Sequence, residues 1–170
     1  MQDASSDGRS TPSLSASAQR VQAALAAAGV PSVITEYATP ARTSAEAAQV
    51  LGCRVGQIAK SLVFRTASGN AVLVIASGAN RVDEARVAAL AGEAIGKADA
   101  AYVRAVTGYA IGGIPPLAHA QQLMTFVDRD LARYDVVYAA GGTPHAMFPI
   151  PPDRLIEVSG GTVADVALLA

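Results

Sequence analysis

Apolar positions recur at two different spacings along this chain, and the segments that carry them alternate irregularly. Helical spacing, bounded by capping and stop residues, predicts four helices. Gly29 and Pro31 end the first, and the second opens at Thr43 with Glu46 in the manner of a capping box and ends at Gly52. We expect these helices over residues 15–28, 43–51, 83–90 and 99–106, the last two capped by Asp83 and Asp99.

Short β-rich runs lie between and after these helices. They predict strands over residues 32–37, 61–65, 71–76, 124–127, 136–139 and 146–150, with a hairpin signal at 67–70. Residues 151–153 open a short helical turn, and we expect residues 162–169 to end the chain as a helix. Because the strands come as hairpins and isolated runs, the pattern favours a single α+β domain. Its sheet is expected to be mixed and mainly antiparallel, or barrel-like, with surrounding helices.

The composition narrows the class of protein. The chain of 170 residues is 51% apolar and 16% charged, which excludes general disorder and permits one ordinary core. Residues 1–14 lack an apolar core segment, so we expect a disordered tail rather than a secretory signal, followed by one domain over 15–170. No segment is long and apolar enough to span a bilayer.

Charge and cysteine content limit the partners and the compartment. The formal net charge is −1, so the chain has no global basic field, and RNA binding would need a local patch. Cys53 is the single cysteine and cannot form an internal disulfide. This is compatible with a reducing cytoplasm, which is the location we expect.

Lys60 stands in the apolar run 58–64, and the chain has only one other lysine, Lys97. If the run is a buried strand, an ammonium at its head costs desolvation and persists only where an anion or polar groups compensate it. Alternatively, Lys60 lies at the rim of the strand and its stem reaches water. On position alone the second interpretation is favoured.

Two glycine pairs mark candidate binding loops. Gly112 and Gly113 lie in the segment 109–116, where glycine permits positive φ and close backbone approach and two prolines fix the exit. Such a loop can present backbone N–H groups to a ligand, or it can be a simple tight turn. The second pair, Gly141 and Gly142, is on its own better explained as a hairpin turn.

Other kinds of site lack support in the sequence. His119 and His145 are not spaced with cysteine or acidic residues as a zinc site requires, so we expect no metal and no other cofactor. The chain has no glycine-rich phosphate loop and no serine-hydrolase motif. Cys53 follows a glycine at a helix end, where the helix dipole disfavours a thiolate nucleophile.

Three segments in order resemble one known family. Residues 58–64, 107–117 and 137–142 are similar to the motifs of the YbaK/aminoacyl-tRNA synthetase-associated domain family, free-standing relatives of the editing domain of bacterial prolyl-tRNA synthetases. The resemblance covers residues 16–166. It implies a YbaK-like α+β fold and hydrolysis, in trans, of the ester of a mischarged tRNA, with tRNA(Pro) favoured by family habit.

The resemblance also implies roles for particular residues. Lys60 would contact the terminal nucleotide of the tRNA, the loop from Gly112 to Pro116 would hold the aminoacyl group, and the later glycine pair would wall the same pocket. The implied catalytic residues are Lys60, Gly112 and Gly113. The implied substrate-binding residues are Ile114, Pro115, Pro116, Gly141, Gly142, Thr143 and Met147.

Some assignments stay open between a site role and an ordinary one. Ile114, Met147 and Phe148 are candidate pocket walls or plain core, and Arg42, Arg54, Arg65 and Arg81 border the site or are solvated surface residues. The partner implied is the 3′ end of a mischarged tRNA, with an aminoacyl-tRNA synthetase as an optional second partner. Neither DNA nor a membrane is implied.

The chain departs from the Cys-tRNA(Pro) deacylases of the family at three places. Ala140 and Pro115 stand where those proteins carry serine, and residues 143–145 replace basic residues. Cysteine specificity is therefore in doubt, and alanine, serine, threonine or a nonprotein amino acid stays open as the group removed. A second class of function is a non-catalytic module that binds an aminoacyl-adenosine or RNA end, or docks on a synthetase.

Overall fold

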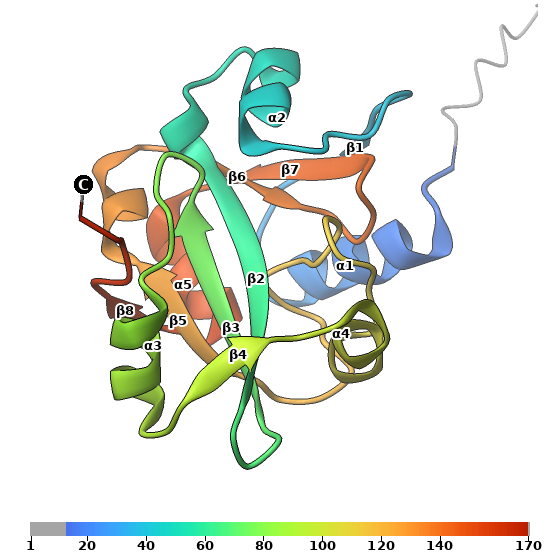
Figure 1. The fold of residues 1–170 in the computed structure, drawn as a ribbon. Helices are drawn as coiled ribbons and strands as arrows, with labels where there is room; N and C mark the ends of the chain where they lie inside the picture. Colours follow the sequence, from blue (N-terminus) through green and yellow to red (C-terminus); the bar gives the residue numbers. More distant parts are fainter. Residues whose placement is uncertain (1–12, 170) are drawn as a thin grey trace, which may run out of the picture.

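The computed structural model describes residues 13–169, and an eight-stranded sheet organises them. The strands follow the order β1-β7-β6-β2-β3-β5-β8, and β4 pairs with β2 outside this path (Figure 1). Antiparallel pairs join β1 to β7, β2 to β3, β2 to β4 and β6 to β7, while β2–β6, β3–β5 and β5–β8 are parallel. The expected mixed, mainly antiparallel sheet is confirmed. The bounds are β1 Thr35–Glu36, β2 Ile58–Thr66, β3 Ala71–Ser77, β4 Ile95–Lys97, β5 Met124–Asp128, β6 Val137–Ala140, β7 Ala146–Ile150 and β8 Thr162–Ala164.

The helices begin where the sequence places their caps. Side chains of Ser15, Thr43, Asp83 and Asp99 accept backbone N–H bonds at the four expected N-termini. Left-handed Gly52 ends the second helix, as expected. The helices are α1 Ala16–Ala27, α2 Ser44–Leu51, α3 Glu84–Ala91, α4 Ala100–Thr107 and α5 Pro152–Ser159, with 3-10 turns η1 Val55–Gln57 and η2 Arg129–Arg133. Residues 1–12, most of the predicted tail, lie outside the described residues.

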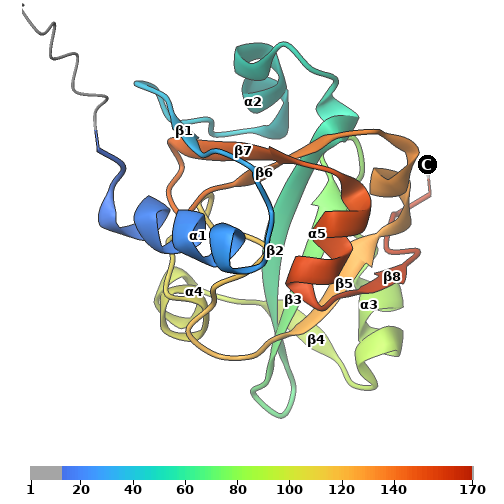
Figure 2. The ribbon, with the colours of Figure 1, turned by 180° about the vertical axis from the view of Figure 1, so that it is seen from behind.

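β3 is buried along its whole length because both of its faces are covered. Leu73 and Ile75 belong to the apolar cluster that includes residues of α1 and α5, the two helices that cross the back of the sheet (Figure 2). Val72 and Val74 alternate with them and pack in a second cluster with Val87 of α3. The rigid centre of the fold is therefore the middle of β3.

The last segment of the chain is not the helix predicted over residues 162–169. Thr162–Ala164 is a strand that pairs in parallel with Phe126–Asp128, and Ala167 bridges to Val82. The N–H of Leu168 donates to the carbonyl of Arg81, so the backbone bonds across the chain rather than within a helical turn. Apolar spacing alone does not separate a short helix from an edge strand.

Two other elements differ from expectation. β4 was not predicted, and the predicted strand over 32–37 is reduced to the two residues of β1. Before β1 the chain is held by side chains instead of a ladder: the Ile34 N–H donates to the Gln22 side chain, and the Ser32 hydroxyl donates to the Pro149 carbonyl. Side-chain partners of this kind replace strand pairing.

Candidate functional site

Two adjoining hollows lie along β2. The first has a volume of about 290 Å³ and follows residues 58–62 of the strand. It is closed by the start of α2, by the loop after α4 and by β7. Its lining consists of Ala41, Arg42, Thr43, Ser44, Ala47, Ile58, Ala59, Lys60, Ser61, Leu62, Ile111, Gly112, Ile114, Ala140, Pro144, Ala146 and Met147.

The second hollow continues along the strand over residues 60–64 and has a volume of about 480 Å³. It is bordered by the loop after β3, by α3, by β4 and by α4. Its lining consists of Lys60, Ser61, Leu62, Val63, Phe64, Asn80, Arg81, Val82, Glu84, Lys97, Ala98, Val103, Ile111 and Ile114. The two hollows therefore share residues 60–62, Ile111 and Ile114.

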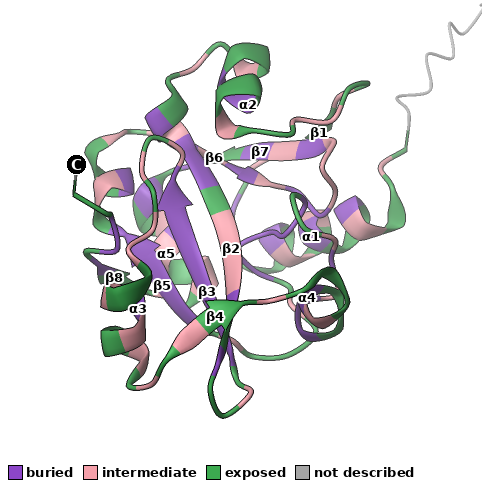
Figure 3. Cartoon of the chain, in the orientation of Figure 1, coloured by how far each residue is buried: buried purple, intermediate pink, exposed green. Residues whose placement is uncertain are grey.

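Lys60 lies at the junction of the two hollows. It pairs with Ala76 of β3 in the strand register, yet its side chain is exposed, and β2 shows a half-exposed stretch beside fully buried β3 in Figure 3. The interpretation in which its ammonium is desolvated is wrong, because the hollows keep this stretch of β2 open to water. Among residues 13–169, Lys60 makes no ion pair.

The first glycine pair lies in a tight turn, and each of the two glycines is required there for a different reason. The N–H of Gly113 donates to the carbonyl of Ala110 at 3.0 Å, and Gly112 at the third position of this turn has φ +89°. At Gly113 the requirement is space, since a Cβ there would lie 2.6 Å from the Cα of Thr143. Gly112 therefore lines the first hollow while Gly113 is packed behind it.

Two side-chain hydrogen bonds hold the loop that carries this turn. The hydroxyl of Tyr109 donates to the carbonyl of Ala118 at 2.8 Å, and Ala118 itself is held at φ +65°. Nε2 of His119 lies 2.6 Å from the carbonyl of Pro115, so Nε2 carries the proton. Burial lowers the pKa of His119, opposed by this hydrogen bond, and burial raises the pKa of Tyr109. Both side chains therefore stay uncharged, and they hold the loop through these hydrogen bonds.

The second glycine pair is the turn of the β6–β7 hairpin. The N–H of Gly141 donates to the carbonyl of Ala146 at 2.7 Å, and Gly142 has φ +107°. A Cβ on Gly142 would lie 2.8 Å from the carbonyl oxygen of Ser17 in α1, so this glycine faces the helix. The backbone of Thr143 packs closely against Gly113. The hollow is instead lined by residues on either side of this pair, Ala140, Pro144 and Ala146.

The structure thus brings together only part of the predicted set. Lys60, Gly112, Ile114 and Met147 line the first hollow, whereas Gly113, Pro115, Pro116, Gly141, Gly142 and Thr143 do not line it. Phe148 is a buried core residue. Of the four arginines considered, Arg42 lines the first hollow and Arg81 the second. Arg54 and Arg65 line neither, and Arg65 stacks on Tyr102 with 4.7 Å to the ring centroid.

The hydroxyl-bearing lining residues that sequence reasoning missed come from the start of α2 and from β2. Thr43, Ser44 and Ser61 place three hydroxyls around the first hollow, and its lining contains no carboxylate, histidine or cysteine. α2 approaches because Ala47 and Ala48 pack on Ile58. The only sequence signal for this contact is the small size of the two alanines.

Residues 13–169 contain no group of three histidine, cysteine, aspartate or glutamate residues placed to hold a metal ion. In the same part of the chain, none of the helices has both the length and the apolar character that a membrane crossing needs.

Comparisons with known proteins identify the family and the fold. A family model described as the aminoacyl-tRNA editing domain matches residues 38–158. A crystal structure described as that of a "putative trans-editing enzyme for prolyl tRNA synthetase" is 44% identical and superposes with a TM-score of 0.87, covering 92% of this chain and all of that one (100%).

Two curated bacterial proteins are also similar. YwhH of Bacillus subtilis, an uncharacterized protein, is 29% identical over 126 residues, which is 74% of this chain and 80% of that protein. EbsC of Enterococcus faecalis, named a "putative Cys-tRNA(Pro)/Cys-tRNA(Cys) deacylase", is 23% identical over 122 residues, or 70% of this chain and 73% of that protein.

Proposed function

Because the chain belongs to the aminoacyl-tRNA editing domain family, we propose that it hydrolyses the ester of a mischarged tRNA in trans. One observation carries the proposal: Lys60 and the Gly112 turn line the same small hollow. A cation and backbone dipoles in one hollow can hold an anionic nucleotide and polarise a neighbouring carbonyl group. The near-complete overlap with a structure described as a trans-editing enzyme supports the same reaction.

In the proposed reaction the ester carbonyl lies against the Gly112 turn. The amide of Gly113 is already taken by Ala110, so the polarising donors are the N–H groups of Gly112 and Ile114, for which residues 13–169 supply no acceptor. A water molecule attacks the carbonyl carbon and loses its proton to solvent. The resulting oxyanion collapses, the bond to the ribose oxygen breaks, and that oxygen takes up a proton.

No protein nucleophile takes part in this proposal. The first hollow offers the hydroxyls of Thr43, Ser44 and Ser61 as water-positioning groups, and no carboxylate, histidine or cysteine lines it. An amino-acid ester beside a vicinal hydroxyl is an activated ester, so positioning and electrostatic stabilisation can supply most of the acceleration. Lys60 acts by holding the terminal nucleotide through its phosphate.

The walls of the first hollow suggest a small amino-acid side chain. Ile58, Ile114 and Met147 limit its size, and the three hydroxyls leave room for a weakly polar group. Exclusion by steric clash discriminates against larger side chains more strongly than the attraction of one methylene selects smaller ones.

The tRNA and a protein partner are proposed from the names of the relatives and from the net charge. One relative is named for prolyl-tRNA synthetase and another for Cys-tRNA(Pro) and Cys-tRNA(Cys), which supports tRNA(Pro) here. The net charge of −1 gives weak long-range attraction to RNA, which favours help from a synthetase. Because tRNA is charged in the cytoplasm, the reaction belongs there.

The direct test is release of amino acid from a panel of tRNA(Pro) samples charged with alanine, serine, threonine, cysteine or proline. We expect rapid release from at least one mischarged sample and none from prolyl-tRNA(Pro). Lys60→Ala should lower kcat/KM by about 100-fold, the size of a lost hydrogen bond to a charged group. Its melting temperature should be unchanged, since Lys60 is exposed.

Arg104→Ala is the matched control, because Arg104 is exposed and lines neither hollow. It should retain wild-type turnover. Binding of the charged tRNAs without release of any amino acid would instead identify a non-catalytic module, and equal turnover of Lys60→Ala and wild type would remove Lys60 from the mechanism.

A further inference from the structure

Both lysines of the chain, Lys60 and Lys97, line the second hollow, together with Arg81. All three are exposed, and within residues 13–169 none of them forms an ion pair. Glu84 is the one carboxylate among the lining residues. The hollow therefore carries a local excess of positive charge on a chain whose net charge is −1, and it attracts an anionic ligand.

Besides these cations the hollow has an apolar lining. Leu62, Val63 and Phe64 of β2 form it with Val82 and Val103. Its volume of about 480 Å³ is that of a small-ligand site. A ligand that uses both parts has an apolar, stackable portion and an anionic edge, which is the chemistry of a nucleotide.

The cations are spread along the hollow. Lys97 pairs with Phe64, four residues along β2 from Lys60, so the two backbone positions are about 13 Å apart at the rise of a strand. A ligand with several phosphates spaced along a chain contacts both ends more easily than a single phosphate ion does.

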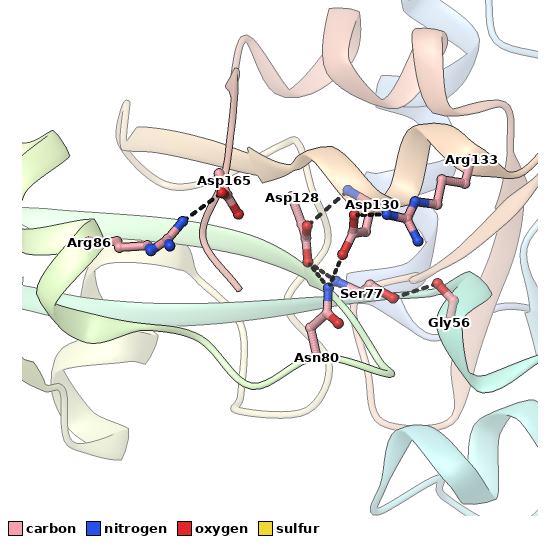
Figure 4. Close-up of polar contacts among 8 residues, drawn as sticks. All are labelled: Gly56, Ser77, Asn80, Arg86, Asp128, Asp130, Arg133 and Asp165. Atoms are coloured by element: carbon pink, nitrogen blue, oxygen red, sulfur yellow. Dashed lines mark hydrogen bonds and ion pairs between the residues drawn. The ribbon is translucent and has the colours of Figure 1, made fainter. Parts of the chain in front are cut away.

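Arg81 is presented by a loop that a buried polar cluster holds in place (Figure 4). Asp128 is 2% exposed and accepts bonds from the Ser77 N–H at 3.0 Å and from the Asn80 side chain at 2.9 Å. The same Asn80 amide group donates to Asp130 at 2.8 Å. The loop position next to Arg81 is thus fixed before any ligand arrives.

The second hollow is also continuous with the first through residues 60–62, Ile111 and Ile114. We propose that the second hollow binds the nucleotides that precede the terminal adenosine, with their phosphates at the cations, while the first holds the aminoacyl end. The proposal rests on the proposed function, since it takes the ligand to be one continuous RNA end. Arg81 and Lys97 are then substrate-binding residues.

The test compares two substrates that differ only in the preceding nucleotides. One is the aminoacyl ester of adenosine, and the other is the same ester on a short RNA ending in CCA. The double variant Arg81→Ala/Lys97→Ala should lower kcat/KM on the RNA ester by about 10- to 100-fold, mainly through KM, and leave the adenosine ester unchanged. Arg104→Ala serves as the matched charge-removal control.

The salt dependence gives a second readout. The slope of log affinity against log salt for the RNA should fall by ~0.7 for each cation lost, and a merely structural defect would not change it in this way. Unchanged turnover of both esters by the double variant, or equal losses on both, overturns the proposal.

Failure of the proposed function is recognised separately. If the wild-type protein releases no amino acid from either ester, binding of the uncharged CCA-ended RNA still tests whether the second hollow is an RNA site. Salt-sensitive binding that the double variant loses supports the second hollow as an RNA site, and binding that the double variant retains overturns it.

Discussion

The first hollow is bordered by three hydroxyls, two cations and no carboxylate, whereas the second is bordered by three cations, one hydroxyl and one carboxylate, although both use the same middle stretch of β2. The difference separates two tasks along one strand. Apolar walls and amide dipoles suit a neutral reacting group, and unpaired cations suit a phosphodiester. Lys60 belongs to both hollows, so it sits where an aminoacyl end would join its nucleotide.

The largest effect is expected from a change in the loop after α4, which borders both hollows. Gly113→Ala places a Cβ 2.6 Å from the backbone of Thr143, so the turn that carries Gly112 must shift. We expect deacylation of every ester to fall by at least about 100-fold and the free energy of unfolding to fall by about 1–3 kcal/mol. Steady-state kinetics and urea unfolding measure the two effects.

Gly96→Ala is the matched control for this glycine. Gly96 is exposed, and a Cβ there would meet no heavy atom within 4 Å. It should keep both activity and stability. Wild-type kinetics for Gly113→Ala would show that the close approach of the two loops is dispensable.

A variant of the buried carboxylate should affect mainly the second hollow. Asp128 accepts from Ser77 and Asn80 on Oδ2 and from the Asp130 N–H on Oδ1, so in Asp128→Asn the new NH₂ group faces a donor at either position. The free energy of unfolding should fall by about 1–3 kcal/mol. KM for the RNA ester should rise more than KM for the adenosine ester, because the loop before Arg81 loosens.

Asp135→Asn, at an exposed aspartate, is the control for the loss of one charge. It should match wild type in chemical denaturation and in both KM values. Equal KM changes on the two esters in Asp128→Asn would contradict a selective effect on the second hollow.

A change confined to the first hollow should alter selection of the amino acid. Met147→Ala enlarges the first hollow without removing a charge, so esters of larger aliphatic amino acids should gain by about 10-fold relative to alanine. Competition between two charged tRNAs reads this ratio directly. Met124→Ala, at an exposed methionine of β5, should leave it unchanged, and an unchanged ratio in Met147→Ala would exclude Met147 from selection.

The smallest expected effect is a pH dependence of the free energy of unfolding. It comes from His119, whose hydrogen bond holds the loop that borders both hollows. Burial lowers the pKa of His119 below the usual 6.5, so at pH values between the two the unfolded chain binds more protons. Stability should be constant above pH 6.5 and fall as the pH drops through the lowered pKa. His119→Gln keeps a donor for the Pro115 carbonyl and does not titrate, so thermal melts of this variant should lose that part of the slope. A slope identical to wild type would assign the pH dependence to other groups.

Much of the local structure was predictable from particular residues. Thr43, Asp83 and Asp99 cap helices because short polar side chains satisfy N–H groups that no helix can satisfy internally. The family was predictable from three motifs in order, and the match over residues 38–158 confirms it. The C-terminal segment was not predictable, because Thr162–Ala164 becomes a strand only through its partner β5.

The sequence by itself determined which residues turn, cap and repeat, and it identified Lys60 and the Gly112 turn as chemically unusual. Tertiary structure decided what surrounds them. β2 and β3 are both rich in apolar residues and pair over seven positions, yet β3 is sealed between helices and β2 is left open along two hollows. Residues distant in the chain decide three things: which strand is buried, why Gly112 and Gly113 are each required, and that both lysines line one hollow. Local patterns do not encode those contacts, because packing is satisfied only when the whole sheet is assembled.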